Sequence, residues 1–326
     1  MVQNGLGRTL IIANPAAHSG EGESAALFAT RFFSSFHSET SSCEVRLTES
    51  AGDAVRMSSR ATDYDSIVAL GGDGLIHEVA NGIMRMPEEL RPRLGIIPMG
   101  SGNDFARTIG MTANNIEQSI YELLRGEERY IDLGKVNETY FVETLSFGTD
   151  AAIAIDTTER RKNHTRQKGS ALYATSGIKL IVCGRKGWEY KANIDGEEVE
   201  GTDIVFAVQN GPTYGGGFRI TPDAIPDDGY LDMCYTQSRA ALPHALLLFG
   251  LARVGKHTNS RSLTIRRARH AELEFVGEEA APCQVDGEEY SANRYVIDVV
   301  PQALRVIVPE GCTWQGRLHG RQNTYA

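Results

Sequence analysis

Residues 67–83 read IVALGGDGLIHEVANGI, and this stretch decides the fold. Its apolar start, Ile67–Leu70, is typical of a buried parallel strand. Leu75, Val79 and Ile83 then recur at four-residue steps, which predicts one face of a helix. A strand, a glycine turn and a helix in this order bring backbone N–H groups and a helix N-terminus up to a phosphate. The alternative is a tight turn that needs glycine only for its dihedral angles.

A second glycine turn shifts the balance towards phosphate binding. The short apolar run Leu94–Pro98 is followed by GSGNDFAR over residues 100–107. Glycine lets the backbone approach a ligand closely, and Asp73 places a carboxylate where a metal or a hydroxyl could be held. Two such turns, each after a buried strand, favour a nucleotide site over two unrelated turns.

Strand-like runs and helical segments alternate through the first part of the chain. Thr9–Ala13 and Glu44–Thr48 are the strand-like runs that precede the first glycine turn. The alternation predicts a doubly wound parallel sheet, in which ligands bind at the carboxyl ends of the strands. Asn14, Thr48 and both glycine turns lie at those ends, so we expect them to form one site.

Beyond residue 131 the pattern changes to short strand-like runs, the last two being Tyr295–Val300 and Leu304–Val308. Turn signals such as Asp195-Gly196 and Asp286-Gly287 separate the runs. This pattern predicts an antiparallel β-sandwich or β-barrel.

Two helices, Ser170–Val182 and Leu242–Val254, are expected to interrupt these strands. We therefore predict an α/β plus all-β protein in three parts. They are a nucleotide-binding domain (residues 1–131), a β-sandwich domain for substrate and catalytic base (132–308), and a C-terminal tail returning to the first domain (309–326).

Composition narrows the class of protein. A net charge of −9 argues against a general nucleic-acid binder, which needs a basic excess. The five cysteines are scattered without a Cys-x-x-Cys pair, which indicates reduced thiols rather than disulfides or a zinc site. The N-terminus does not resemble a signal peptide, and the longest apolar run is too short to span a bilayer. We expect a cytoplasmic protein whose membrane contact is peripheral.

Several motifs occur together over nearly the whole chain. They are Asn14-Pro15, Thr48, Gly71-Gly72-Asp73-Gly74 with Glu78, Gly100-Ser101-Gly102-Asn103-Asp104-Phe105-Ala106, Phe147-Gly148-Thr149-Asp150-Ala151, Asn210-Gly211, Gly215-Gly216-Gly217, Pro222-Asp223-Ala224 with Asp228-Gly229, and Asp286-Gly287-Glu288. In this set and order the chain resembles the diacylglycerol kinase catalytic-domain family, and most closely its soluble bacterial lipid kinases.

The resemblance implies roles for individual positions. The residues it implies for ATP binding are Asn14, Thr48, Gly71, Gly72, Asp73, Gly74, Leu75, Ile76, His77, Ser101, Asn103 and Asp104. It makes Glu288 the candidate general base and Asp73 a second catalytic residue. It also implies a Mg²⁺ ion held by the carboxylate of Asp228 and the backbone carbonyls of Ile225 and Tyr230. Phosphoryl transfer needs these parts: positioning, neutralised phosphate oxygens, and a base on the acceptor hydroxyl.

The chain departs from the family pattern at three positions on the nucleotide side. Leu75 stands where threonine is typical, His77 where asparagine is usual, and Glu21 where a basic residue is frequent. These differences bear on nucleotide affinity or preference rather than on the fold.

Plainer interpretations exist for several motifs. Asp228-Gly229 and Asp286-Gly287 are common turns, and Glu288 could be a solvated strand residue. The basic run Arg160, Arg161, Lys162, Arg166 and Lys168 could be a solvated face or could dock on anionic headgroups. Leu246–Phe249 reads as core, although a lipid-facing helix would look the same.

The sequence thus predicts an ATP-dependent lipid kinase with a cleft between its two domains. The expected acceptor is a hydroxyl on a membrane lipid, with diacylglycerol first. The alternatives are a kinase of a soluble substrate such as NAD, which shares the Gly-Asp-Gly turn, and a non-catalytic lipid- or nucleotide-binding module. The sequence leaves open whether the protein forms a homodimer.

Overall fold

The computed structural model describes residues 5–34, 42–162, 167, 169–183, 187–203, 205–238, 240–277 and 280–314. These residues form two compact units. Unit 1 comprises the described residues of Met1–Ile131 together with Gln302–Trp314, and unit 2 comprises those of Asp132–Pro301.

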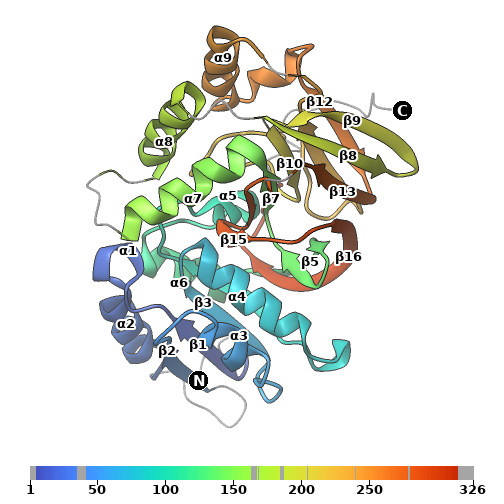
Figure 1. The fold of residues 1–326 in the computed structure, drawn as a ribbon. Coiled ribbons are helices and arrows are strands. Elements are labelled where there is room, and N and C mark those ends of the chain that lie inside the picture. Colours follow the sequence, from blue (N-terminus) through green and yellow to red (C-terminus); the bar gives the residue numbers. More distant parts are fainter. Residues whose placement is uncertain are drawn as a thin grey trace. The chain divides into compact units, whose positions relative to one another are not determined.

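The centre of unit 1 is a parallel sheet (Figure 1). Its strands are β1 (Thr9–Ala13), β2 (Cys43–Leu47), β3 (Ser66–Gly71) and β4 (Arg93–Pro98), in the order β2-β1-β3-β4. The C-terminal part of β16 (Tyr295–Val308) extends the sheet parallel to β4, with Val306 opposite Leu94. β1 and β3 are buried along their whole length, as near-continuous apolar runs require. The predicted parallel α/β architecture is confirmed.

Helices follow the strands of unit 1. They are α1 (Ala17–Gly20), α2 (Gly22–Ser34), α3 (Asp53–Ser58), α4 (Asp73–Met84), α5 (Asp104–Ile109) and α6 (Ile116–Leu124), with a 3₁₀ turn at Glu88–Leu90. α4 buries Leu75, Val79 and Ile83, the predicted face. α3 packs closely on α4 because Gly82 has no side chain, since a Cβ there would lie 2.6 Å from the carbonyl oxygen of Val55.

The segment after β16 packs within unit 1. Trp314 is fully buried, and the guanidinium of Arg129 lies 5.3 Å from the centre of its ring. The thiol of Cys312 lies 2.9 Å from the carbonyl oxygen of Ile109. The remaining part of the predicted tail, residues 315–326, lies outside the described residues.

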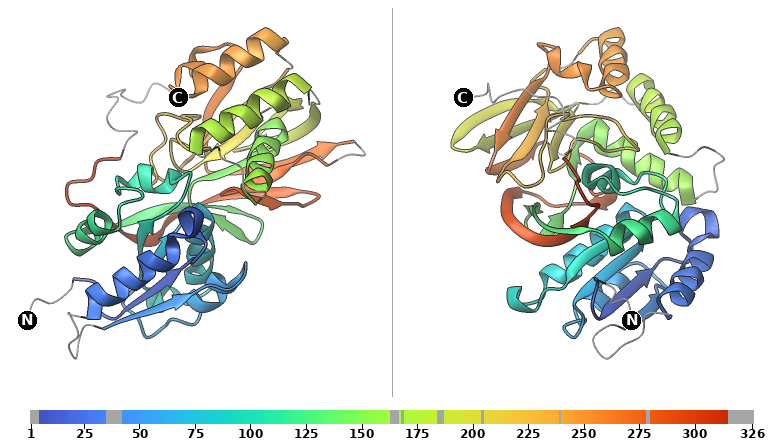
Figure 2. Two further views of the ribbon diagram at one scale, coloured as in Figure 1. Left: turned by 90° about the vertical axis from the view of Figure 1, so that its left-hand side faces the viewer. Right: turned by 180° about the vertical axis from the view of Figure 1, so that it is seen from behind.

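Unit 2 contains two antiparallel sheets (Figure 2). One sheet has the order β12-β11-β10-β7-β14-β15, and in the other the N-terminal part of β16 is followed by β13, β8 and β9. β5 pairs with β16 and with β6. The bounds are β5 (Glu127–Val136), β6 (Thr139–Phe141), β7 (Thr144–Phe147), β8 (Trp188–Ile194), β9 (Glu197–Asp203), β10 (Val205–Gln209), β11 (Leu231–Tyr235), β12 (Thr264–Ala268), β13 (His270–Val276), β14 (Cys283–Val285) and β15 (Glu288–Tyr290).

The six-stranded sheet of unit 2 is covered on both faces. Phe206 points into the sandwich core, where its ring lies 5.3 Å from that of Tyr190, while the next residue, Ala207, faces the other side. That other side packs against α7 (Gly148–Lys162), α8 (Gly169–Cys183), α9 (Leu242–Ala252) and the 3₁₀ turn Lys256–Asn259. The predicted antiparallel domain is confirmed, and its sheet carries a helical layer.

Three features of unit 2 differ from the sequence-based expectation. The runs Tyr295–Val300 and Leu304–Val308 form the single strand β16, although Gln302 has a φ of 49°. The two units divide within this strand, after Pro301, whereas the predicted second domain continues to residue 308. The third is helix α7, which the sequence does not predict because its apolar residues Ala151–Ile155 are consecutive.

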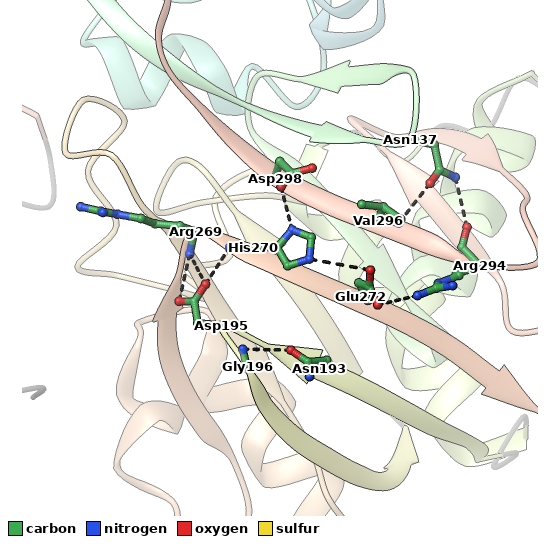
Figure 3. Close-up of polar contacts among 10 residues, drawn as sticks. All are labelled: Asn137, Asn193, Asp195, Gly196, Arg269, His270, Glu272, Arg294, Val296 and Asp298. Atoms are coloured by element: carbon green, nitrogen blue, oxygen red, sulfur yellow. Dashed lines mark hydrogen bonds and ion pairs between the residues drawn. The ribbon is translucent and has the colours of Figure 1, made fainter.

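The Asp195-Gly196 hairpin has the predicted turn form. Asp195 has a φ of 49°, and its carboxylate accepts hydrogen bonds from the backbone N–H groups of Arg269 and His270 at 3.2 and 2.9 Å (Figure 3). The same face carries a chain of polar contacts in which Nδ1 of His270 lies 2.7 Å from a carboxylate oxygen of Asp298.

Candidate active site

The glycine turns of unit 1 lie where the strand order reverses. β1 pairs with β2 on one side and with β3 on the other, so the crevice beyond β1 and β3 is the topological switch point of the sheet. Asn14 follows β1 and Gly72 follows β3 at this point, and a Cβ on Gly71 would lie 3.5 Å from the Cβ of Asn14. Thr48 follows β2 at the same edge and donates its backbone N–H to the carbonyl of Ala13 at 2.9 Å. The structure therefore brings these predicted residues to one edge.

Asp73 joins the two glycine turns. Its carboxylate accepts the backbone N–H of Asn103 at 2.7 Å and that of Asp104 at 3.0 Å. The turns are in backbone contact, because a Cβ on Gly100 would lie 2.8 Å from the Cα of Gly72. Glycine is required at Gly102 too, where a Cβ would lie 2.6 Å from a carboxylate oxygen of Asp73. These glycines therefore let the two turns pack backbone against backbone, a form that glycine turns at phosphate sites use.

The second turn is stiffened by its own side chains. Asn103 is buried, has a φ of 53°, and exchanges hydrogen bonds with the backbone N–H and carbonyl of Gly100 at 2.8 and 2.7 Å. Asp104 forms an ion pair of 3.0 Å with Arg107. Ser101 is half-buried at the tip of the turn. Asn103 and Asp104 thus shape the loop, whereas Ser101 stays partly exposed.

The side chains of the first turn of α4 lie partly in the core and partly at the surface. Leu75 and Ile76 are buried, and Leu75 packs against Gly71. His77 is half-buried, with the side-chain amide of Asn81 3.4 Å from its ring. The side chains of Leu75 and Ile76 are therefore structural, and any ligand contact at these positions is made by the backbone.

Glu78 has a structural role that its motif did not reveal. Its carboxylate accepts the backbone N–H of Gly52 at 2.9 Å and that of Ala54 at 3.1 Å, at the start of α3. These bonds satisfy donors that a helix N-terminus leaves open. Glu78 lies 26 residues after Gly52 and 24 residues after Ala54. The local sequence around α3 therefore gives no signal for this cap.

In unit 2, a hairpin presents Glu288. Asp286 has a φ of 48° and is buried, and its carboxylate accepts the backbone N–H groups of Val142, Glu143 and Thr144 at 2.9–3.0 Å. Glu288 begins β15, pairs with Val285 of β14, and has an exposed side chain. The first residue of the motif therefore anchors the turn, and the third points into solvent.

The loop predicted to hold magnesium is already tied together by protein groups. Asp228 forms an ion pair with Arg267 and also accepts the backbone N–H of Tyr230 at 3.1 Å. The guanidinium of Arg267 lies 4.5 Å from the ring centre of Tyr230. A carboxylate with the carbonyls of Ile225 and Tyr230 is an oxygen donor set of the kind that Mg²⁺ prefers. A cation here would have to displace Arg267 from Asp228, and the part of the chain that the structure describes contains no group of three or more acidic, histidine or cysteine side chains arranged for a metal.

Asp150 is at the centre of a buried network that sequence reasoning did not assemble. Its carboxylate accepts hydrogen bonds from the hydroxyls of Tyr173, at 2.8 Å, and Tyr214. Burial raises the pKa of Asp150, and its second oxygen makes no hydrogen bond. These residues come from α7, α8 and the loop before β11, so only the tertiary fold unites them.

An apolar cavity of about 80 Å³ adjoins Asp150. Ile153 of α7, Ile181 of α8 and Phe249 of α9 are among its lining residues. His257 also lines it, with Nε2 3.0 Å from the carbonyl of Ile220, and burial lowers its pKa. The helical layer of unit 2 is thus hollow beneath α8 and α9.

A larger hollow in unit 1 is at the wrong edge for the predicted chemistry. It has a volume of about 810 Å³ and is lined by Arg8, Asp65 and Arg93, which precede or begin β1, β3 and β4. Ligands of parallel α/β sheets bind at the opposite, carboxyl edge. We therefore assign the site to the glycine turns.

A parallel sheet with two glycine turns at its switch point, followed by an antiparallel unit, is the architecture of the class of two-domain phosphotransferases. Family comparison agrees with this class. Residues 8–136 match the diacylglycerol kinase catalytic domain, and residues 143–308 match the YegS C-terminal NAD kinase beta sandwich-like domain. The chain belongs to the diacylglycerol kinase catalytic-domain family, as its sequence motifs predicted.

Relatives and solved structures support the assignment. The chain is 31% identical over 281 residues to a protein of Yersinia enterocolitica named "Probable lipid kinase YegS-like", covering 83% of this chain and 89% of that one. It is 30% identical over 243 residues to the diacylglycerol kinase of Bacillus subtilis, covering 74% and 77% of the two chains. A crystal structure of a diacylglycerol kinase from Bacillus anthracis has the same fold, with a TM-score of 0.74, 23% identity, and coverage of 94% and 99%.

The family establishes the reaction type. The protein is a kinase that transfers a phosphoryl group to an alcohol, and membership of this family implies ATP as the donor. Within the described ranges, no helix is both long and apolar enough to cross a membrane.

Proposed function

We propose that this protein transfers the γ-phosphate of ATP to the hydroxyl of a membrane lipid, and that diacylglycerol is the acceptor and phosphatidic acid the product. The observation that carries the proposal is the pair of glycine turns that Asp73 locks together at the switch point of the sheet. Relatives named as lipid and diacylglycerol kinases support the lipid acceptor.

Unit 1 provides the nucleotide site in this proposal. Backbone N–H groups of Gly71–Gly74 and the start of α4 face the phosphates, with Ser101 contributing from the second turn. Asn14 and Thr48 lie at the same edge, next to β1 and β2, and are proposed to contact the rest of the nucleotide. ATP supplies the phosphoryl group, and the chain contributes position and hydrogen-bond donors.

Unit 2 provides the base in this proposal. Glu288 is the residue proposed to accept the proton of the lipid hydroxyl, because it is a carboxylate at the tip of a hairpin that Asp286 holds rigid. Asp73 is the second catalytic residue proposed, acting by fixing the geometry of the phosphate-binding turns.

Mg²⁺ is proposed as the counter-ion of the phosphates, as in other phosphoryl transfers. Ile225, Asp228 and Tyr230 are the residues proposed to hold a Mg²⁺ ion in unit 2. The ion pair with Arg267 is its competitor, so a cation and Arg267 would exclude each other at Asp228.

Peripheral contact with a membrane is part of the proposal, since a lipid acceptor lies in a bilayer. In the basic run, Arg160 donates hydrogen bonds to the hydroxyls of Thr175 and Ser176 at 3.0 and 2.7 Å, so it ties α7 to α8. Arg166 and Lys168 lie outside the described residues. Arg160 is therefore a poor choice for headgroup binding.

The identity of the phosphoryl acceptor is tested by giving the enzyme more than one candidate acceptor. The purified protein is incubated with γ-labelled ATP and Mg²⁺, together with vesicles containing diacylglycerol or with NAD, and the products are separated by thin-layer chromatography. We expect label in phosphatidic acid. Label in NADP would point to the soluble-substrate alternative, and ATP binding without any labelled product would point to a binding module.

A further inference from the structure

Exposed apolar side chains gather on α8 and α9. Among the described residues of unit 2, five large hydrophobic side chains are exposed, and four of them belong to this region. Ile178 and Val182 of α8 are 52% and 46% exposed, four residues apart and so on one face of the helix. Leu247 of α9 and Val254, just beyond its end, are 57% and 58% exposed.

The two helices form one surface. Phe249 of α9 packs onto α8 at Gly177, where any side chain would collide with its ring. Its ring also stacks at 6.4 Å with that of Tyr173 of α8. α8 and α9 accordingly lie side by side as the outermost layer of unit 2 (Figure 1). We call the exposed residues Ile178, Val182, Leu247 and Val254 the α8–α9 face.

The sequence segments that contain this face are basic. Residues 160–188, which contain α8, include eight lysines and arginines and no aspartate or glutamate. The side chains of five of these cations are not among those the structure describes, and of the others Arg160 bonds to α8 and Lys179 pairs with Asp156 of α7 at 2.8 Å. Residues 233–271, which contain α9, include seven and again no acidic residue. The whole chain has a net charge of −9, so the remainder is strongly acidic. Among the cations of the second segment, Arg253, Lys256 and Arg261 are exposed.

We infer that the α8–α9 face is a docking surface for an anionic lipid bilayer, with its apolar side chains inserted among the lipids and its cations at the headgroups. Apolar side chains flanked by lysine and arginine are what an interfacial helix presents to such a membrane. A second copy of this chain fits less well, because a two-fold contact would place cationic segments against each other. The inference rests on the proposed function in that the acceptor lipid must come from a bilayer.

The cavity supports this direction of approach. It lies beneath the same two helices, and Ile181 of α8 with Leu248 and Phe249 of α9 line it. The interior beneath the proposed docking surface is therefore lined by apolar side chains of both helices.

Vesicle binding tests the inference without requiring turnover. Ile178→Ser combined with Leu247→Ser should weaken sedimentation with phosphatidylglycerol vesicles by about tenfold or more, since two apolar side chains no longer insert. Leu27→Ser is the matched control, because Leu27 lies on helix α2 of unit 1 and is 55% exposed against 57% for Leu247. Lys256→Gln with Arg261→Gln should cost about fivefold per cation. Added salt should have the same effect, and phosphatidylcholine vesicles should bind weakly.

The outcomes separate the possibilities. Unchanged vesicle binding by the Ile178→Ser, Leu247→Ser variant, with an unchanged melting temperature, would overturn the inference. So would a shift of that variant from dimer to monomer in sedimentation without vesicles, which would assign the face to a second copy. If the wild-type protein docks through this face yet phosphorylates neither vesicle-bound nor dispersed short-chain diacylglycerol, the proposed function fails and the docking surface stands.

Discussion

The carboxylate of Asp73 accepts backbone N–H groups from Asn103 and Asp104, so a single side chain fixes the spacing of two phosphate-side turns. The sequence identified Asp73 as a residue of the site from its place between glycines. It suggested a group that holds a metal or hydroxyl, because the two donors are 30 and 31 residues away and nothing local indicates them. In the structure, the first role of Asp73 is to hold the two glycine turns in position.

Asp73→Asn should reduce both nucleotide affinity and turnover. An amide NH₂ would face a backbone N–H donor, so one of the two bonds is lost and the turns separate; we expect a fall in rate of about a hundredfold or more. Calorimetry with ATP and the rate of labelled lipid product measure the two effects. Asp63→Asn, at an exposed position of the same unit, is the control. Wild-type affinity and rate in Asp73→Asn would remove Asp73 from the site.

Asp150 predicts a pH dependence of stability. Burial raises its pKa in the folded protein above the ordinary value of about 4. An acid whose folded pKa is raised makes folding less favourable as pH rises from the unfolded pKa to the folded one, by at most about 1.4 kcal/mol per pH unit. Asp150→Asn keeps an oxygen for the hydroxyls of Tyr173 and Tyr214 but cannot ionise. The variant should therefore gain stability relative to wild type as the pH rises above about 4, measured by urea unfolding. A difference that does not change with pH would show that Asp150 takes up no proton on folding in this range, which contradicts a raised pKa.

At the scale of elements, two Asp-Gly hairpins share a backbone form but differ in burial. Asp286 and Asp195 have φ values of 48° and 49°, and each carboxylate accepts backbone N–H groups from a neighbouring strand or loop. Asp286 is buried, whereas Asp195 is exposed. The sequence predicted both turns and could not tell which one anchors the interior.

Asp286→Ala should be much more destabilising than Asp195→Ala. The first leaves the buried N–H groups of Val142, Glu143 and Thr144 without an acceptor, a loss of about 3 kcal/mol or more. Water can replace the carboxylate at Asp195, so about 1 kcal/mol is expected there. Denaturant unfolding of the two variants measures the difference. Equal losses would contradict the view that Asp286 anchors the hairpin of Glu288.

The strongly patterned elements were predictable and the others were not. The apolar runs of β1, β3 and β4 and the four-residue steps of α4 located the parallel sheet. Helix α7 was missed because its apolar residues, Ala151–Ile155, are consecutive and give no helical spacing. The sequence predicted two strands in place of β16, because Pro301 and Gln302 interrupt the apolar pattern. In the structure the strand is continuous, since its N-terminal part pairs with β13 and its C-terminal part pairs with β4.

For the whole molecule, the sequence predicted the α/β and antiparallel architectures. It also predicted that Asn14, Thr48 and the two glycine turns lie at one edge of the parallel sheet. This worked because the carboxyl ends of parallel strands meet at one edge whatever the details of packing. The network of Asp150, Tyr173 and Tyr214 could not be predicted, since it needs three separate elements. The exposure of α8 and α9 could not be predicted either, because an apolar helix reads the same whether it faces a core or a membrane.

The central claim is that the protein is a lipid kinase whose general base is Glu288. Its most direct test is the rate at which labelled phosphatidic acid forms from diacylglycerol, with the affinity for ATP measured on the same variants. Wild type should form the product, and Glu288→Gln should form it about a hundred to ten thousand times more slowly with ATP affinity unchanged. Glu289→Gln should behave as wild type, because the next residue of β15 points to the opposite face of the strand. The absence of labelled phosphatidic acid from the wild-type reaction, or an undiminished rate in Glu288→Gln, would contradict the account.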